Sequence, residues 1–218
     1  AVVEPAEPYR VAVLFGGRKR DWPDHLSSPI PGVSLSLHAV PELEYDAGVS
    51  ISPAPQQLAG ALRVRLNEIG FTPDNTVLHI HNHALGKSLS LPGALIRMAQ
   101  DGFGVLLQIH DFAEDFRPDN YRRLQAHLGG DEPERFYRTL YPQAAQIHYA
   151  VLNGRDRTVL HSAGVAPSQL HGLPNPVAEF SGLPTRDGGK AKLREHLGDV
   201  IGERLVLYPV RGIRRKNV

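Results

Sequence analysis

The fold is decided by residues 77–121, which read VLHIHNHALGKSLSLPGALIRMAQDGFGVLLQIHDFAEDFRPDNY. Aliphatic and β-branched runs predict strands over Val77–His81 and Gly104–Ile109, and the apolar segment Leu91–Gln100 between them predicts a helix. Each strand runs into ionisable residues where a loop begins. In an open parallel sheet, ligands bind outside the carboxyl ends of the strands, so these two ends are the first candidates for a functional site.

Strands and helices alternate outward from this stretch. Further strands are predicted at Tyr9–Phe15, Val33–Val40, Ala145–Leu152, Ser168–Leu173 and Arg204–Val210, and further helices at Gln56–Ile69, Pro118–Leu128, Pro133–Leu140, Asn153–Gly164 and Lys190–Leu197. This order predicts an α/β fold, with a doubly wound, mainly parallel sheet and helices on both faces, over residues 1–177. Residues 178–189 have a linker's composition, so 178–218 are predicted to be a linker and the truncated start of a second domain.

Composition narrows the class of protein. The chain has 218 residues, 41% of them hydrophobic and 22% charged, with a net charge of +1. That balance is typical of a globular protein and gives no reason to expect nucleic acid as a partner. There is no cysteine, which excludes disulfides and thiolate metal sites and fits a cytoplasmic location. No apolar run reaches the roughly 20 residues of a membrane-spanning helix.

The histidines around the first strand end allow two interpretations. His79, His81 and His83 alternate along the chain, which places three imidazoles on one strand face, where they could bind zinc with His110 or Asp111. A strand covered by helices instead buries histidines that are satisfied by hydrogen bonds. We therefore expect no metal and treat His81 and His83 as polar substrate contacts, while a His-ligated metal hydrolase stays open as an alternative.

Two loops could hold an anion. Gly86-Lys87-Ser88 precedes a helix but lacks the earlier glycine of a P-loop, so only the helix N-terminus and Lys87 are expected to attract negative charge. Gly16-Gly17 follows the first strand and is succeeded by Arg18 and Lys19, which could meet phosphate or carboxylate. A solvated turn explains the second loop equally well.

The densest ionisable cluster is His110-Asp111-Phe112-Ala113-Glu114-Asp115. Burial or mutual repulsion at a strand end could shift the pKa of one of these carboxylates and make it a proton carrier. Histidine can also exchange hydrogen bonds with sugar hydroxyls. An acidic loop that only caps a helix is the alternative, but the neighbouring histidine-rich strand end favours a functional site.

Taken in order, four motifs resemble those of GT-B-fold glycosyltransferases, in particular the retaining, family 4-like enzymes. Gly16-Gly17 is similar to the loop that approaches the donor phosphates, and Gln108–Asp111 is similar to the segment whose histidine contacts the donor sugar. Pro174–Val177 resembles the segment that leads into the second domain. Arg211 and Lys216 have the R-x4-K spacing of the pair that grips the donor diphosphate.

The resemblance implies transfer of a sugar, with retention, from a UDP- or GDP-linked donor, without a metal or another cofactor. His110 and Asp111 are then the catalytic candidates, and Arg211 and Lys216 bind the donor diphosphate. The implied substrate-binding residues are Gly16, Gly17, Arg18, Lys19, His81, His83, Lys87, Glu114, Asp115 and Asn120.

The resemblance also implies an acceptor that is a small molecule, a glycan or a lipid-linked sugar, and it allows peripheral membrane contact. The chain ends at Val218 without the family's E-x7-E-type motif. We therefore expect the acceptor-side half of an enzyme, inactive alone, with the carboxyl-terminal donor half as its missing partner. A non-catalytic glycan- or nucleotide-binding module is the remaining alternative.

Overall fold

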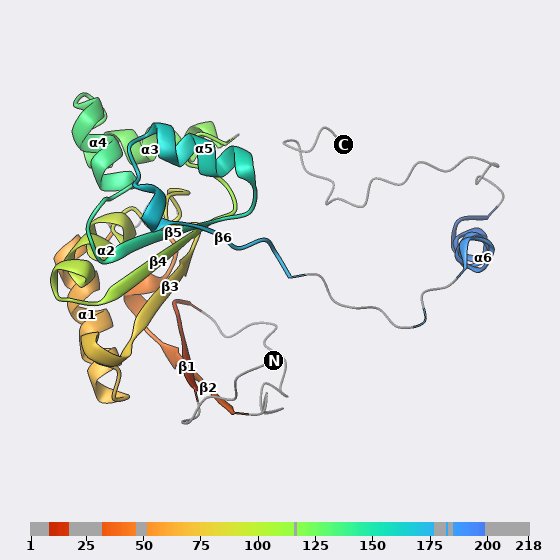
Figure 1. Ribbon diagram of the computed structural model, residues 1–218, viewed down its shortest axis with the longest axis horizontal. Helices are drawn as coiled ribbons and strands as arrows, with labels where there is room; N and C mark the ends of the chain where they lie inside the picture. The colour runs from red at the N-terminus through yellow and green to blue at the C-terminus, as the bar shows by residue number, and fades with distance from the viewer. Residues whose placement is uncertain are drawn as a thin grey trace. The chain divides into compact units, whose positions relative to one another are not determined.

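The structure is a computed structural model that describes residues 9–17, 32–46, 52–115, 117–176, 182 and 185–198 (Figure 1). The strands are β1 (Tyr9–Phe15), β2 (Val33–Ala39), β3 (Val77–His81), β4 (Gly104–Ile109), β5 (Ile147–Val151) and β6 (Leu170–Gly172). The helices are α1 (Pro55–Glu68), α2 (Leu91–Gln100), α3 (Pro118–Leu128), α4 (Pro133–Leu140), α5 (Gly154–Ser162) and α6 (Arg186–Leu197).

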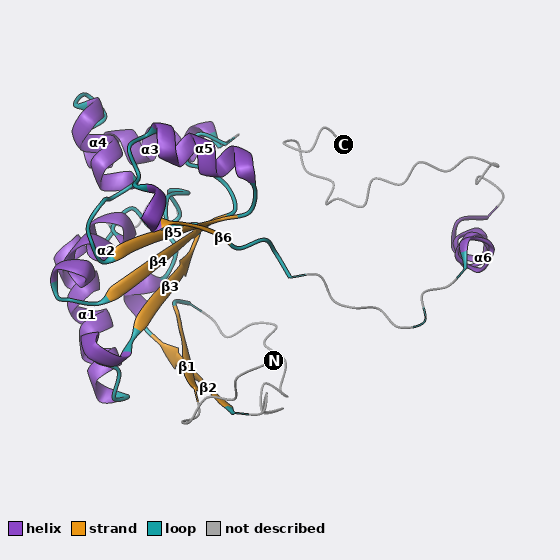
Figure 2. Cartoon of the chain, viewed as in Figure 1, coloured by secondary structure: helices purple, strands orange, loops and turns teal. Residues whose placement is uncertain are grey.

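All the described strand pairs are parallel (Figure 2). Four strands form a sheet in the order β3-β4-β5-β6, with helices or helix-containing segments between successive strands, and β1 and β2 form a separate pair. This arrangement confirms the predicted α/β fold with a parallel, Rossmann-like sheet. Parallel strands of this kind place their carboxyl ends at one edge, which positions the loops discussed below.

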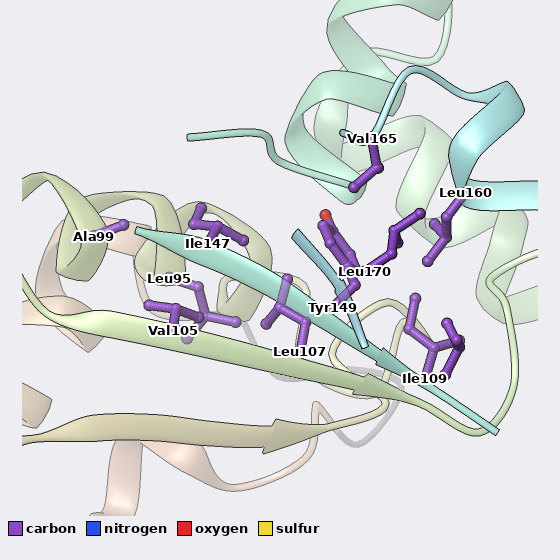
Figure 3. Close-up of a cluster of buried hydrophobic side chains, with 11 residues drawn as sticks. Leu95, Ala99, Val105, Leu107, Ile109, Ile147, Tyr149, Leu160, Val165 and Leu170 are labelled. Atoms are coloured by element: carbon purple, nitrogen blue, oxygen red, sulfur yellow. The ribbon is translucent and has the colours of Figure 1, made fainter. Parts of the chain in front are cut away.

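The main core lies between the four-stranded sheet and helices α2 and α5 (Figure 3). Alternate residues of β4 and β5 point into it, because side chains alternate between the two faces of a strand. The fully buried members include Leu107, Tyr149 and Leu160. The hydroxyl of Tyr149 donates a hydrogen bond of 2.7 Å to the carbonyl oxygen of Pro142, which satisfies this polar atom inside the core.

The opposite face of this sheet carries polar side chains among apolar ones such as Leu106 and Ala150. It carries His79, His81, Gln108, His148 and His171, and none of the three hydrophobic clusters of the described residues includes a side chain from it. Helices α1 and α2 share a second cluster that includes Leu58 and Met98, and α3 and α4 share a third that includes Leu124 and Phe136. Helices α2 and α5 therefore pack on the face of the sheet away from the histidines.

Most predicted elements are confirmed, and the differences lie at boundaries. Strand β6 is shorter than predicted because the turn Pro167–Gln169 occupies its first residues. The predicted linker 178–189 is wrong at its end, since α6 already begins at Arg186. The hydroxyl oxygen of Thr185 accepts a hydrogen bond of 3.2 Å from the Gly188 amide and caps that helix. The strand predicted at 204–210 lies outside the described residues.

The chain divides into two compact units, Ala1–Pro174 and Asn175–Val218. The first contains all six described strands and helices α1 to α5. In the second, the described part is mainly α6, which buries no side chain. No helix of the described residues has the length and the apolar character needed to span a membrane.

Candidate functional site

The loops after β3 and β4 are joined by Asn82. Its side-chain oxygen accepts hydrogen bonds from the backbone amides of His110, at 2.8 Å, and Asp111, at 3.1 Å. The backbone amide of Asn82 donates a hydrogen bond of 3.0 Å to the backbone carbonyl oxygen of Gln108. The backbone of Asn82 has a φ of 55°, and it alone among the described non-glycine residues has a positive φ. This residue therefore fixes where the second loop leaves the sheet.

Three imidazoles meet at this edge of the sheet. Nδ1 of His81 and Nε2 of His110 lie 2.9 Å apart, so one nitrogen donates a hydrogen bond and the other accepts it. The rings of His79 and His81 are 4.5 Å apart between centroids. Nε2 of His79 in turn lies 2.9 Å from the side-chain oxygen of Gln108. We name His79, His81 and His110 the histidine cluster; it brings together residues from two strand ends.

The environment of His81 favours its neutral form. Partial burial lowers the pKa of His81 below its ordinary value of 6.5, and the neighbouring His79 and His110 lower it further. A neutral imidazole can both donate and accept a hydrogen bond. Through the hydrogen bond that they share, His81 can thus hold His110 in position. His110 can then contact a hydroxyl group of a bound ligand.

The carboxylates of the loop after β4 point to different partners. Asp111 forms an ion pair of 2.8 Å with Arg117, and Asp115 accepts a hydrogen bond of 2.7 Å from the Phe112 amide. Glu114 accepts one of 2.9 Å from the hydroxyl of Tyr141. Burial, and next the charge of Glu114, raise the pKa of Tyr141 and keep it protonated. Asp115 thus fixes the loop, and both Asp115 and the exposed Glu114 line a cavity.

His83 is separated from the histidine cluster. Strand β3 ends at His81, and the left-handed Asn82 turns His83 into the protein interior, where it is 2% exposed. Its Nε2 donates a hydrogen bond of 2.8 Å to the Leu140 carbonyl oxygen, and its Nδ1 has no partner. The prediction of three imidazoles on one strand face is therefore wrong at His83. Burial lowers the pKa of His83 to about 4, against the weaker effect of the Leu140 bond.

The start of helix α2 already holds a carboxylate. Oδ2 of Asp46 accepts a hydrogen bond of 2.7 Å from the amide of Leu89, just before the helix. This side chain occupies the place where the sequence predicted that an external anion could bind. The ammonium group of Lys87 lies 4.7 Å from the centre of the Tyr45 ring and is exposed. Lys87 can therefore still contact a ligand beside α2, although Asp46 already occupies the amide at the start of this helix.

The remaining predicted site residues fall into two groups. Asn120 donates a hydrogen bond of 2.8 Å to the carbonyl oxygen of Leu85 and braces the loop after β3. Gly16 lies against the backbone of Leu43 and Glu44, so closely that a Cβ atom would overlap it. Gly17 has a φ of 73° and faces the Glu44 side chain. The predicted cationic residues outside the described part of the chain are Arg18, Lys19, Arg211 and Lys216.

Among the described residues, no group of three or more His, Cys, Asp or Glu side chains is arranged to hold a metal ion. The residues that organise the site and that sequence reasoning missed are Asn82, Arg117 and Tyr141. Only Asn82 had a signal in the sequence, because asparagine directly after a strand often adopts the left-handed conformation. Arg117 and Tyr141 are recognised only through their partners.

Comparison with known proteins gives one distant similarity. The chain is 26% identical over 231 aligned residues to mannosylglucosyl-3-phosphoglycerate synthase of Petrotoga mobilis (strain DSM 10674 / SJ95). The alignment covers 97% of this chain but only 41% of that protein. No protein-family model matches the chain, and no solved structure gives a significant match. The chain therefore spans less than half the length of this relative.

Proposed function

We propose that this chain is the acceptor-side part of a glycosyltransferase of the retaining, family 4-like GT-B kind. The observation that carries the proposal is the 2.9 Å contact of His81 with His110, at the carboxyl ends of two adjacent parallel strands. Ligands of open α/β sheets bind at this edge. The similarity to a sugar-transferring synthase over 97% of this chain supports the same reading.

In this proposal the reaction uses a UDP- or GDP-linked hexose as donor. His110, oriented by His81 and Asn82, donates or accepts a hydrogen bond with a donor-sugar hydroxyl and holds the reacting carbon in place. Asp111 is kept beside it by Arg117. Arg211 and Lys216 stabilise the negative charge of the departing diphosphate. No metal takes part.

The name of the Petrotoga relative suggests the acceptor. We propose a sugar-bearing 3-phosphoglycerate, an acceptor with a phosphate and a carboxylate. Lys87 is an exposed cation in the segment between β3 and α2 that can meet one of these groups. We propose that the donor half corresponds to the part of the Petrotoga relative outside the alignment, which covers 41% of that protein. The absence of cysteine fits a cytoplasmic setting.

The test joins the chain to the part of the Petrotoga synthase outside the alignment. UDP- and GDP-hexoses are offered with 3-phosphoglycerate and its glucosyl derivative, and product is measured by mass spectrometry. His110→Ala should lower kcat/KM about tenfold or more, as expected when a hydrogen bond in the reacting complex is lost. His127→Ala, an exposed histidine on α3, is the matched control. Equal activity of His110→Ala and the parent would overturn the proposal, as would no transfer from any donor.

A further inference from the structure

A cavity of about 1160 Å³ lies on the helical face of the four-stranded sheet, between α2, α4 and α5. It extends from the start of β5, at Gln146, to Glu114 and Asp115 in the loop after β4. Cavities that bury a small organic ligand usually measure about 300–1000 Å³, so this one has room for more than one sugar ring. Neither His81 nor His110 lines it, which makes it separate from the histidine cluster.

The accessible walls of the cavity are aromatic, polar and in part aliphatic. The aliphatic residues of its floor are only 1 to 2% exposed; they are Ala99, Ile147, Leu160 and Val165. Tyr137 is 43% exposed, and Phe112 and Tyr141 are half-buried with ring centroids 6.1 Å apart. Val159 is 44% exposed, Ile96 is half-buried and Ala163 is exposed, so the walls also offer some aliphatic surface. The C–H faces of sugars pack on such rings.

The charges of the cavity disfavour an anionic ligand. Its lining contains four carboxylates but two guanidinium groups, from Glu114, Asp115, Glu134, Asp156, Arg138 and Arg155. Glu134 and Arg138 neutralise each other through an ion pair of 2.6 Å. The net negative charge that remains repels phosphate. Hydroxyl groups instead donate to carboxylates and accept from guanidinium and amide groups, and the amides of Gln100 and Gln143 are also present.

We propose that this cavity binds a neutral oligosaccharide. The choice of sugar as the ligand class rests on the proposed function, and the position of the site rests on the cavity itself. The neutral sugar units of an acceptor, or of a glycan to which the enzyme is held, would occupy it while the anionic end of the acceptor lies elsewhere. Glu114, which lies in the same loop as Asp111, places one end of the cavity near the proposed reaction site.

The proposal is tested by titrating the full chain with maltose and with mannobiose, in the absence of a donor, and recording amide chemical shifts. Binding in the millimolar range should shift amides of residues 112–115, 134–141 and 155–159, and glucose 6-phosphate should bind more weakly. Preference for glucose 6-phosphate would overturn the proposal. So would shifts confined to other residues, or no shifts at about 20 mM saccharide, where a site of millimolar affinity is nearly full.

Variants of Tyr137 test whether its aromatic ring contacts the bound saccharide. Tyr137→Ala should weaken saccharide binding about tenfold, the effect of one lost contact of ~1.4 kcal/mol. Tyr137 also shares a hydrogen bond of 3.0 Å with the Tyr121 hydroxyl, so Tyr137→Phe, which keeps the ring, should bind like the parent. Tyr9→Ala removes a tyrosine that is 66% exposed on β1 and is the control. Unchanged binding by Tyr137→Ala would overturn the proposal.

The failure of this site can be told apart from failure of the proposed function, because saccharide binding needs no donor. Saccharide binding at the cavity without transfer in the joined enzyme would leave the site standing and overturn the function. Transfer that depends on His110, without saccharide binding at the cavity, would leave the proposed function standing and overturn the saccharide site.

Discussion

Asn82 holds the backbone of His110 through a hydrogen bond of 2.8 Å from the His110 amide to its side-chain oxygen. The same oxygen accepts from the amide of Asp111, so one side chain satisfies two consecutive donors at the end of β4. Left-handed backbone is costly for most residues but tolerated by asparagine. The position of His110 beside His81 therefore depends on Asn82 in two ways, through its left-handed backbone and through its side-chain oxygen.

Replacing Asn82 should loosen the loop after β4. Asn82→Ala loses both acceptor contacts and adds backbone strain, and it should lower the free energy of unfolding by about 1–3 kcal/mol in urea titrations. Amide hydrogen exchange at His110 and Asp111 should become faster. Asn82→Gly avoids the backbone strain but still lacks the acceptor oxygen. Asn82→Asp keeps a side-chain oxygen and tolerates the left-handed backbone. Unchanged exchange at His110 in Asn82→Gly would contradict the proposed role of the side-chain oxygen.

The titration of His81 should report on the histidine cluster. Its pKa, read from ring proton shifts, is expected below 6.5 because partial burial and the charges of His79 and His110 oppose protonation. His110→Ala should raise the pKa of His81, since it exposes the ring and removes one repelling charge. A His81 pKa that is unchanged in His110→Ala would show that the two rings do not contact each other in solution.

Much of the fold follows from local sequence. Strand β4 and helices α2, α3 and α4 have the bounds that periodicity and flanking prolines predict, because each has one strong signal at each end. The start of α6 was missed because Gly188 and Gly189 suggest a linker. There the Thr185 cap outweighs the low helix propensity of glycine.

The candidate site was predictable in its location but not in its contacts. The carboxyl ends of β3 and β4 follow from the strand pattern, whereas the separation of His83 from His81 depends on the φ of Asn82. The Asp46 side chain at the start of α2 comes from a distant segment, 43 residues before Leu89. Sequence spacing alone does not show such a long-range contact.

Replacing Gly16 and Gly60 by alanine should change the stability of the protein in opposite directions. Gly16→Ala should destabilise the protein strongly, by about 2 kcal/mol or more, because the new Cβ would overlap the backbone of Leu43 and Glu44. Gly60 lies inside helix α1, and a Cβ there would meet nothing within 4 Å, so Gly60→Ala should stabilise by up to about 1 kcal/mol. Thermal and urea unfolding measure both. Equal stability of the two variants would contradict the close packing at Gly16.

The burial of His83 predicts a stability that falls with acidity. The folded protein has a His83 pKa of about 4, below its ordinary 6.5, because burial disfavours the charged ring. The unfolded chain therefore binds more protons between these values, and stability is lost as the pH falls from about 6.5 toward 4, by up to about 3 kcal/mol.

His83→Gln removes this titration and keeps a side-chain N–H group that can donate to the Leu140 carbonyl oxygen. Its free energy of unfolding, measured in urea at several pH values, should fall less steeply than that of the parent between about pH 6.5 and 4. His127→Gln makes the same substitution at an exposed histidine on α3 and is the control. Parallel pH dependences of the parent and His83→Gln would show that His83 is not buried as a neutral ring, because its proton uptake on unfolding is what separates them.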